Sequence, residues 1–135
     1  MAVFIGDRKN STAARVGLKI NYARTYIIQP AIKAQYPLSD FKLNHMVGID
    51  TSELLVTKTG IRGANDLLWM GKASNHAAKL CSLSHNYSTR VTKRVFDKLN
   101  DASKIGSDGR SMWEASTWTD MNNAALYRST WSWSI

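Results

Sequence analysis

Segments with the pattern of strands alternate along this chain with segments that have the pattern of helices. Over residues 13–27, apolar side chains recur every three or four positions, which predicts an amphipathic helix. Pro30 is expected to end or kink this helix, because proline lacks the backbone donor and clashes with the preceding turn. The alternation predicts an α/β fold in which helices pack on a sheet. The apolar stripe of this first helix consists of Ala13, Val16, Ile20, Ala23 and Ile27.

Short apolar runs mark the expected strands. Leu67–Met70 is wholly apolar, so we expect it to be buried on both faces. Two late runs with alternating large side chains, Met112–Trp118 and Leu126–Trp133, predict a hairpin. The other short elements expected are Ala2–Ile5, Leu43–Ile49, Glu53–Thr57 and Ser88–Val91.

Two more helices are expected in the second half of the chain. Residues 74–83 form the first, with Ser74 as its cap. Residues 92–100 form the second, and residues 102–111 are expected to be a polar loop. The inner face of the second helix is predicted to carry Val91, Val95, Phe96 and Leu99.

The composition is that of one globular domain. With 135 residues, 44% of them apolar and 21% charged, residues 1–135 are expected to fold as a single domain with its own core. Cys81 is the only cysteine, which excludes an internal disulfide and, with three histidines, a Cys/His zinc site. The start lacks the pattern of a signal peptide, and no apolar run approaches the about 18 residues of a membrane span. A cytoplasmic protein is therefore expected.

The chain is basic, with a net charge of +8 from 18 Lys and Arg against 10 Asp and Glu. A basic surface favours nucleic acid, an anionic membrane or a polyanionic small molecule such as a nucleoside triphosphate. A small basic nucleic-acid-binding domain is therefore one interpretation, although no RNP-like motif occurs. Salt-dependent binding to oligonucleotides would favour that interpretation.

The most distinctive segment is an apolar strand followed by Gly71 and a helix. The first amides of a helix and its dipole favour a bound anion. Asn75 and Lys79 are four residues apart, so they share one helix face. An amide and an ammonium group there could orient a sugar and neutralise a phosphoryl group. The same pair is also common on a solvated helix face, so the pattern alone leaves both interpretations open.

The order of motifs resembles the class III nucleotidyl cyclase homology domain. The matching segments are Gly48-Ile49, Asn65-Asp66 and the helix that follows Gly71. Leu68 occupies the slot that helps to select a purine, and leucine cannot read a purine edge by hydrogen bonding. Together with the tryptophan-rich tail at 127–133, this makes the chain most similar to the pyrimidine cyclases of bacterial antiphage (Pycsar) defence. The resemblance implies a ferredoxin-like fold with a mixed, mainly antiparallel sheet and helices.

The implied activity is conversion of UTP or CTP to a 3′,5′-cyclic nucleotide and pyrophosphate, a signal for a downstream effector. The family forms homodimers, and each site combines metals from one subunit with an Asn/Arg pair from the other. Asn75 matches the family's asparagine. Lys79 stands in place of the family's arginine, and its ammonium group carries the charge but lacks the planar guanidinium that can donate two parallel hydrogen bonds. The substrate-binding residues implied are Asp66, Leu68, Trp69, Gly71, Lys72 and Arg128.

The resemblance also implies Mn²⁺ or Mg²⁺, held by two aspartates near the start of the complete domain. If residues 2–5 match the family's third strand, both aspartates lie before Met1. No metal is then expected to be held by this chain, and we expect it to be N-terminally truncated, inactive alone and only marginally stable. Asp7 follows an apolar run rather than preceding one, so it is expected to be a loop acid.

A non-catalytic regulatory or dimerisation module of cyclase fold is the other alternative. Tight dimers without nucleotide binding would favour it.

Several residues near the matching motifs have simpler structural interpretations. Trp69 is expected in the core, His76 at the surface, Asp50 as a turn acid and Cys81 as a small buried side chain.

Overall fold

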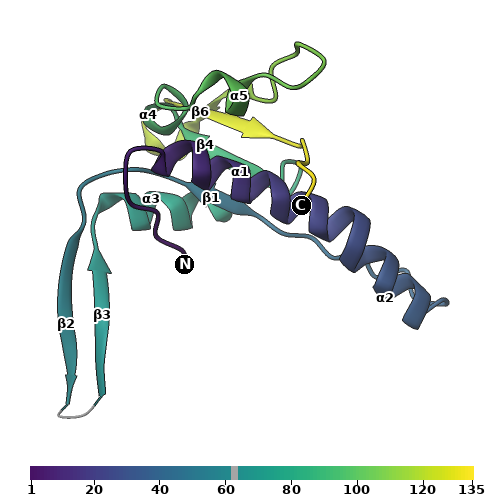
Figure 1. Cartoon of the computed structure of the whole chain (residues 1–135), viewed down its shortest axis with the longest axis horizontal. Coiled ribbons are helices and arrows are strands. Elements are labelled where there is room, and N and C mark those ends of the chain that lie inside the picture. Colours follow the sequence, from purple (N-terminus) through teal and green to yellow (C-terminus); the bar gives the residue numbers. More distant parts are fainter. Residues whose placement is uncertain (62–63) are drawn as a thin grey trace.

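A computed structural model describes residues 1–61 and 64–135 of the chain. A four-stranded sheet lies between helices, and a two-stranded hairpin and the end of a long helix project from this body in different directions (Figure 1). The elements are α1 (Lys9–Tyr22), the π-helix η1 (Ala23–Ile28), α2 (Gln29–Gln35), β1 (Val47–Ile49), β2 (Leu55–Ile61), β3 (Ala64–Met70), α3 (Lys72–Cys81), β4 (Thr89–Thr92), α4 (Lys93–Phe96), α5 (Asp101–Lys104), β5 (Glu114–Trp118), the 3-10 turn η2 (Thr119–Met121) and β6 (Ala124–Ser129). The expected combination of helices with a sheet is confirmed.

The main sheet has the strand order β1-β4-β6-β5. β1 is parallel to β4, whereas β6 is antiparallel to both β4 and β5, so the sheet is mixed and mainly antiparallel as expected. The predicted late hairpin is confirmed as β5 and β6. Its turn places Asn122 and Asn123 at φ of 53° and 55°, a left-handed conformation that asparagine tolerates better than most residues.

The core has two parts, one on each face of the main sheet. Side chains alternate between the two faces of a strand, so Val91 of β4 points to one face and Thr92 to the other. Val91 packs with α1 and with the segment after β4, and the predicted inward positions Val95 and Leu99 are confirmed there. Leu80 of α3 packs with Trp118 and Leu126 in the other cluster. Helices α1 and α3 therefore enclose the sheet between them.

The first helix differs from its prediction in two ways. Helical structure continues past Pro30, which lies just after the π-helical turn η1, where the regular spacing of backbone hydrogen bonds is already interrupted. The predicted stripe is wrong at its far end, because Ile20 and Ile27 are 42% and 52% exposed. The side facing the sheet is instead lined by small residues, since a Cβ on Gly17 would lie 2.9 Å from Thr89 Cγ2. The buried residues of α1 are Asn10, Ser11, Ala13, Ala14, Gly17, Leu18 and Asn21.

One predicted strand is wrong, and a second is a strand whose predicted burial is wrong. Residues 2–5 form an irregular segment that leads into α1. The run Leu67–Met70 does lie in a strand, β3, but it is not buried, because β3 pairs with β2 in the projecting hairpin (Figure 1). Leu67 and Leu68 are 58% and 44% exposed. A wholly apolar run is also the pattern of a surface that another molecule covers.

Smaller differences concern element lengths. In the segment predicted as a strand over 43–49, only β1 (Val47–Ile49) forms a strand. The helix predicted to start at Ser74 begins at Lys72, with Gly71 as its N-cap. The helix predicted over 92–100 is shorter, because α4 covers only Lys93–Phe96. Helix α5 (Asp101–Lys104) overlaps the start of the segment 102–111 expected to be a loop. Across the described residues, no helix combines the length and the apolar character that crossing a membrane requires.

Candidate functional site

Helix α3 lies directly on strand β1. A Cβ added to Gly48 would come within 2.2 Å of the Ala77 carbonyl oxygen and 2.8 Å of Leu80 Cβ, so only glycine allows this approach. Ala73 and Leu80 form the buried side of α3. The opposite side of the helix faces solvent.

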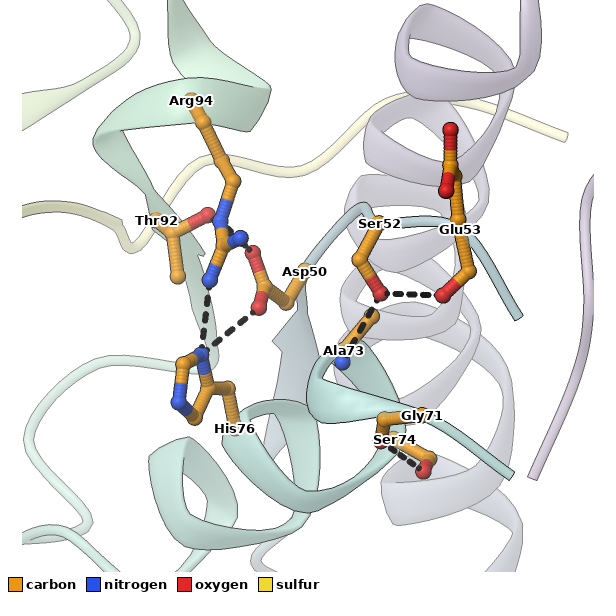
Figure 2. Close-up of polar contacts among 9 residues, drawn as sticks. All are labelled: Asp50, Ser52, Glu53, Gly71, Ala73, Ser74, His76, Thr92 and Arg94. Carbon is orange, nitrogen blue, oxygen red and sulfur yellow. Dashed lines mark hydrogen bonds and ion pairs between the residues drawn. The ribbon is translucent and has the colours of Figure 1, made fainter. Parts of the chain in front are cut away.

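The start of α3 is held by contacts with the segment between β1 and β2 (Figure 2). The backbone N–H of Ala73 donates to Ser52 Oγ at 3.1 Å, and Ser74 Oγ donates to the Gly71 carbonyl at 2.8 Å. A Cβ on Gly71 would lie 2.6 Å from Leu54 Cδ2, so the chain passes too close for a side chain. One of the first amides of α3 is therefore already paired within the protein.

A buried carboxylate joins α3 to the sheet. The side chain of Asp50, just after β1, has no exposed area. Its Oδ1 accepts from Thr92 Oγ1 at 2.6 Å and lies 2.8 Å from Arg94 Nε, while its Oδ2 lies 2.9 Å from His76 Nδ1 (Figure 2). These contacts connect the ends of β1 and β4 with α3 and α4. The sequence pattern predicted an ordinary turn acid at Asp50 and did not indicate this cluster.

His76 has two neighbours that compete for one ring nitrogen. Its Nδ1 lies 2.9 Å from Asp50 Oδ2 and 2.8 Å from a terminal nitrogen of Arg94. A proton on Nδ1 can be donated to Asp50, whereas a bare Nδ1 can accept from Arg94. The two bonds exclude each other at any instant. His76 also stacks edge-on with Trp118, with ring centroids 6.0 Å apart.

Three of the residues predicted to act on substrate share one exposed side of α3. Lys72, Asn75 and Lys79 are all exposed and follow one another at intervals of three and four residues, which is the spacing of one helix face. Within the part of the chain that the structure describes, no hydrogen bond or ion pair engages their side chains. We call this set the α3 stripe.

The other predicted substrate residues lie elsewhere. Leu68 and Trp69 are consecutive in β3, so they point to opposite faces of the hairpin. The Asp66 side chain lies outside the described residues. Arg128 on β6 is paired with Glu114, and its guanidinium carbon lies 4.0 Å from the centre of the Tyr87 ring. The hydrogen bond to the Glu114 carboxylate raises the pKa of Arg128 above its usual value.

The described residues do not form a site for the divalent metals that the resemblance implies. In the described ranges, no three side chains of His, Cys, Asp or Glu gather where they could hold one ion. Asp7 is exposed in the turn before α1. Mn²⁺ and Mg²⁺ need several oxygen ligands at once, and the described residues do not bring such a set together.

Comparison with known proteins identifies the family. No family model matches the chain. Proteins named uridylate cyclase from Xanthomonas perforans and Burkholderia cepacia are 52% and 50% identical to it over all 135 residues. One from Rhodovulum is 38% identical over 97% of the chain. The chain spans 57–58% of the length of these relatives. The chain is therefore similar to these cyclases over its whole length, which confirms its resemblance to the pyrimidine nucleotide cyclases.

Proposed function

We propose that this chain forms part of a pyrimidine nucleotide cyclase that converts UTP or CTP to a 3′,5′-cyclic nucleotide and pyrophosphate. The observation that carries the proposal is identity of up to 52% with proteins named uridylate cyclase over the full chain. The α3 stripe supports it, because its three polar side chains are exposed on a helix that is fixed to the sheet. A basic net charge of +8 also suits a polyanionic substrate.

In this reaction the ribose 3′-oxygen forms a bond to the α-phosphorus and releases its proton to solvent. The bond between the α-phosphorus and the oxygen that bridges to the β-phosphate breaks, and pyrophosphate leaves. Asn75 is proposed to orient the ribose through its amide, which can donate and accept. Lys79 is proposed to neutralise the negative charge that builds up on the α-phosphoryl oxygens. Both contributions depend on position more than on covalent chemistry.

Lys72, Gly71, Leu68, Trp69, Asp66 and Arg128 remain proposed substrate-binding residues. Among them Lys72 has the strongest support, because it is exposed on the same face of α3 as Asn75 and lies one turn before it. It could contact a phosphate of the substrate. Arg128 is already paired with Glu114, so binding a triphosphate would require it to exchange that carboxylate for a phosphate.

We also propose a homodimer that forms through the β2–β3 hairpin. Residues directly opposite each other in an antiparallel pair share a face. Leu55 pairs with Met70 on one face, and these side chains are 64% and 43% exposed. Leu67, 58% exposed, lies on the other face. Such apolar area on a projecting ribbon favours burial against a second copy.

The hairpin equally supports the second candidate, a non-catalytic dimerisation module of cyclase fold. In that case the chain would form dimers but neither bind nor convert nucleotides. Nucleotide binding that depends on Lys79 separates the two candidates. If Lys79→Ala lowers the affinity for UTP and the exposed control Lys98→Ala does not, the cyclase is favoured. If neither the unsubstituted chain nor these variants bind UTP, the dimerisation module is favoured.

Cyclic nucleotide formation tests the proposed function. Purified polypeptide of residues 1–135 is assayed with UTP, CTP, ATP and GTP in Mn²⁺, with product identified by mass spectrometry. We expect no product from it alone, because its described residues do not form a metal site, and we propose that the metal ligands come from elsewhere in the complete assembly. Product above the level of an Asn75→Ala, Lys79→Ala double variant would overturn that expectation. An antiphage role in the cytoplasm, through an effector that binds the cyclic nucleotide, is part of the same proposal.

A further inference from the structure

A polar cavity lies at the end of the sheet where β1 and β4 begin and β6 ends. Its volume is about 110 Å³, and its lining includes Asn21, Arg24, Asn44, His45, His85 and Asn86. It is at the opposite end of β1 and β4 from Asp50, so it is separate from the start of α3. Asn44, His85 and Asn86 are exposed at its rim, which leaves the cavity open to small solutes.

Three buried polar atoms of the lining have no partner in the described part of the protein. They are Asn21 Oδ1, Arg24 Nε and His45 Nε2. Asn21 is only 5% exposed, and its amide nitrogen is fixed by donation to the carbonyls of Thr130 and Trp131, both at 2.9 Å. The orientation of its unpaired oxygen is therefore set. Buried polar groups are almost always paired, so a molecule that supplies these bonds is expected in the cavity.

The local backbone is also unusual. Arg24 lies in η1, and π-helical turns are rare and frequently occur at functional sites. The Arg24 guanidinium makes one long bond, 3.5 Å, to the Leu43 carbonyl, which leaves its Nε free. The π-turn therefore presents a largely uncommitted cation to the cavity.

The charges of the lining favour an anion. Among the described residues that line the cavity there is one permanent cation, Arg24, and there are two imidazoles, His45 and His85, but no carboxylate. The cavity is too small for a whole nucleotide, since pockets for ligands of that size are about 300 Å³ or larger. It has room for one tetrahedral group, and because its rim is open, a second group joined to the first would lie outside it in solvent.

We propose that this cavity is a binding site for a phosphate-type oxyanion. Arg24 Nε and His45 Nε2 donate to its oxygens, and the acceptor Asn21 Oδ1 receives the hydroxyl of a monoprotonated phosphate. Burial and the nearby Arg24 guanidinium lower the pKa of His45, and a bound anion would oppose that effect. Inorganic phosphate and pyrophosphate share this chemistry, and the test distinguishes them.

The test follows the imidazole of His45 by NMR in the 135-residue chain. It is titrated with pH in phosphate, in pyrophosphate and in chloride of matched ionic strength, and thermal unfolding is recorded in each. Phosphate is expected to raise the pKa of His45 and the Tm relative to chloride. Arg24→Gln is expected to weaken phosphate binding about tenfold, and Arg8→Gln, an exposed arginine at the start of α1, is expected to leave it unchanged.

Each outcome decides the proposal. If His45 titrates alike in phosphate, pyrophosphate and chloride, the cavity holds ordered water only and the proposal fails. Tighter binding of pyrophosphate than of phosphate identifies the reaction by-product as the occupant, and the reverse order identifies free phosphate. If Arg24→Gln does not fold, His45→Gln serves as the second variant, and phosphate must then lose its effect on Tm. None of these residues belongs to the α3 stripe, so failure here leaves the proposed cyclase activity untouched.

Discussion

His76 Nδ1 lies 2.9 Å from Oδ2 of Asp50, and this contact joins α3 to the carboxyl end of β1. The Asp50 carboxylate is fully buried, and Thr92 and Arg94 approach its other oxygen. A buried charge is tolerated when donors surround it, and removing the charge leaves those donors unpaired. Asp50 therefore determines how firmly the start of α3 is held.

Replacing Asp50 with alanine is expected to destabilise the fold. Thr92, His76 and Arg94 would all lose a partner, and we expect the free energy of unfolding to fall by about 2–3 kcal/mol, since His76 and Arg94 retain some access to water. Chemical denaturation measures this. Asp97→Ala is the matched control, because Asp97 forms an exposed pair with Lys93, and solvent screens such a pair so that it contributes little to stability. Equal effects of the two substitutions would contradict a structural role for the Asp50 cluster.

Gly48→Ala tests the close packing of α3 on β1. The added Cβ would meet the Ala77 carbonyl, which is backbone and cannot rotate away. We expect a loss of about 1–3 kcal/mol of unfolding free energy from overpacking. Denaturation of this variant is compared with that of Ala78→Ser, which alters an exposed position of the same helix. An unchanged midpoint for Gly48→Ala would mean that α3 does not lie this close to the strand.

The stability of the protein should fall in acid partly through His45. Burial, followed by the Arg24 charge, lowers the pKa of His45 below its usual 6.5. Below pH 6.5 the unfolded chain binds the proton more readily than the folded chain, so the unfolding free energy decreases as pH falls. Above it both states are neutral and this contribution is fully present.

The measurement compares wild type with His45→Gln at about pH 7.5 and about pH 5 in chloride. Wild type is expected to lose more unfolding free energy between the two values than the variant does. His85→Gln, at an exposed position, should behave like wild type. A wild-type loss no larger than that of His45→Gln would show that the burial of His45 has no effect on folding.

The hairpin should matter for association and not for folding. Leu67→Lys places a charge on an already exposed position, so the unfolding free energy is expected to change by about 0.5 kcal/mol or less. Self-association, measured by analytical ultracentrifugation, is expected to be lost. Leu38→Lys is the control, because Leu38 is 99% exposed but lies beyond α2. A dimer that survives Leu67→Lys and dissociates with Leu38→Lys would place the interface at the wrong end of the molecule.

Local patterns predicted much of the fold. The late hairpin and the inner face of residues 91–99 depend on alternation and on three- and four-residue spacing, which neighbouring residues determine. The face shared by Asn75 and Lys79 follows from helix geometry in the same way. These features do not depend on the position of distant segments.

Contacts between distant segments were not predicted. His76 and Thr92 lie 26 and 42 residues after Asp50. The parallel pairing of β1 with β4 brings Thr92 to Asp50, and the packing of α3 on β1 brings His76 there. The orientation of α1 depends on Gly17 meeting Thr89, a contact that no local pattern reveals. The exposure of Leu67 depends on where the hairpin projects. An aspartate directly after one strand and a threonine ending another were the only signals available for the cluster.

The central claim is that the α3 stripe of this chain acts on a pyrimidine nucleoside triphosphate. The most direct test supplies the proposed metal-binding half of the site in trans. The uridylate cyclase of Burkholderia cepacia, with the two residues aligned to Asn75 and Lys79 changed to alanine, is mixed with this chain, UTP and Mn²⁺. Association is checked by native mass spectrometry, and cyclic UMP is quantified.

We predict that this chain restores cyclic UMP formation, that Lys79→Ala abolishes the restoration, and that Lys79→Arg retains it. Asn75→Ala is expected to reduce the rate by about 10²-fold or more, as for the loss of a group that positions the reacting atoms. A mixed complex that forms but makes no cyclic UMP, or one that is equally active with Lys79→Ala, would contradict the proposed role of the α3 stripe.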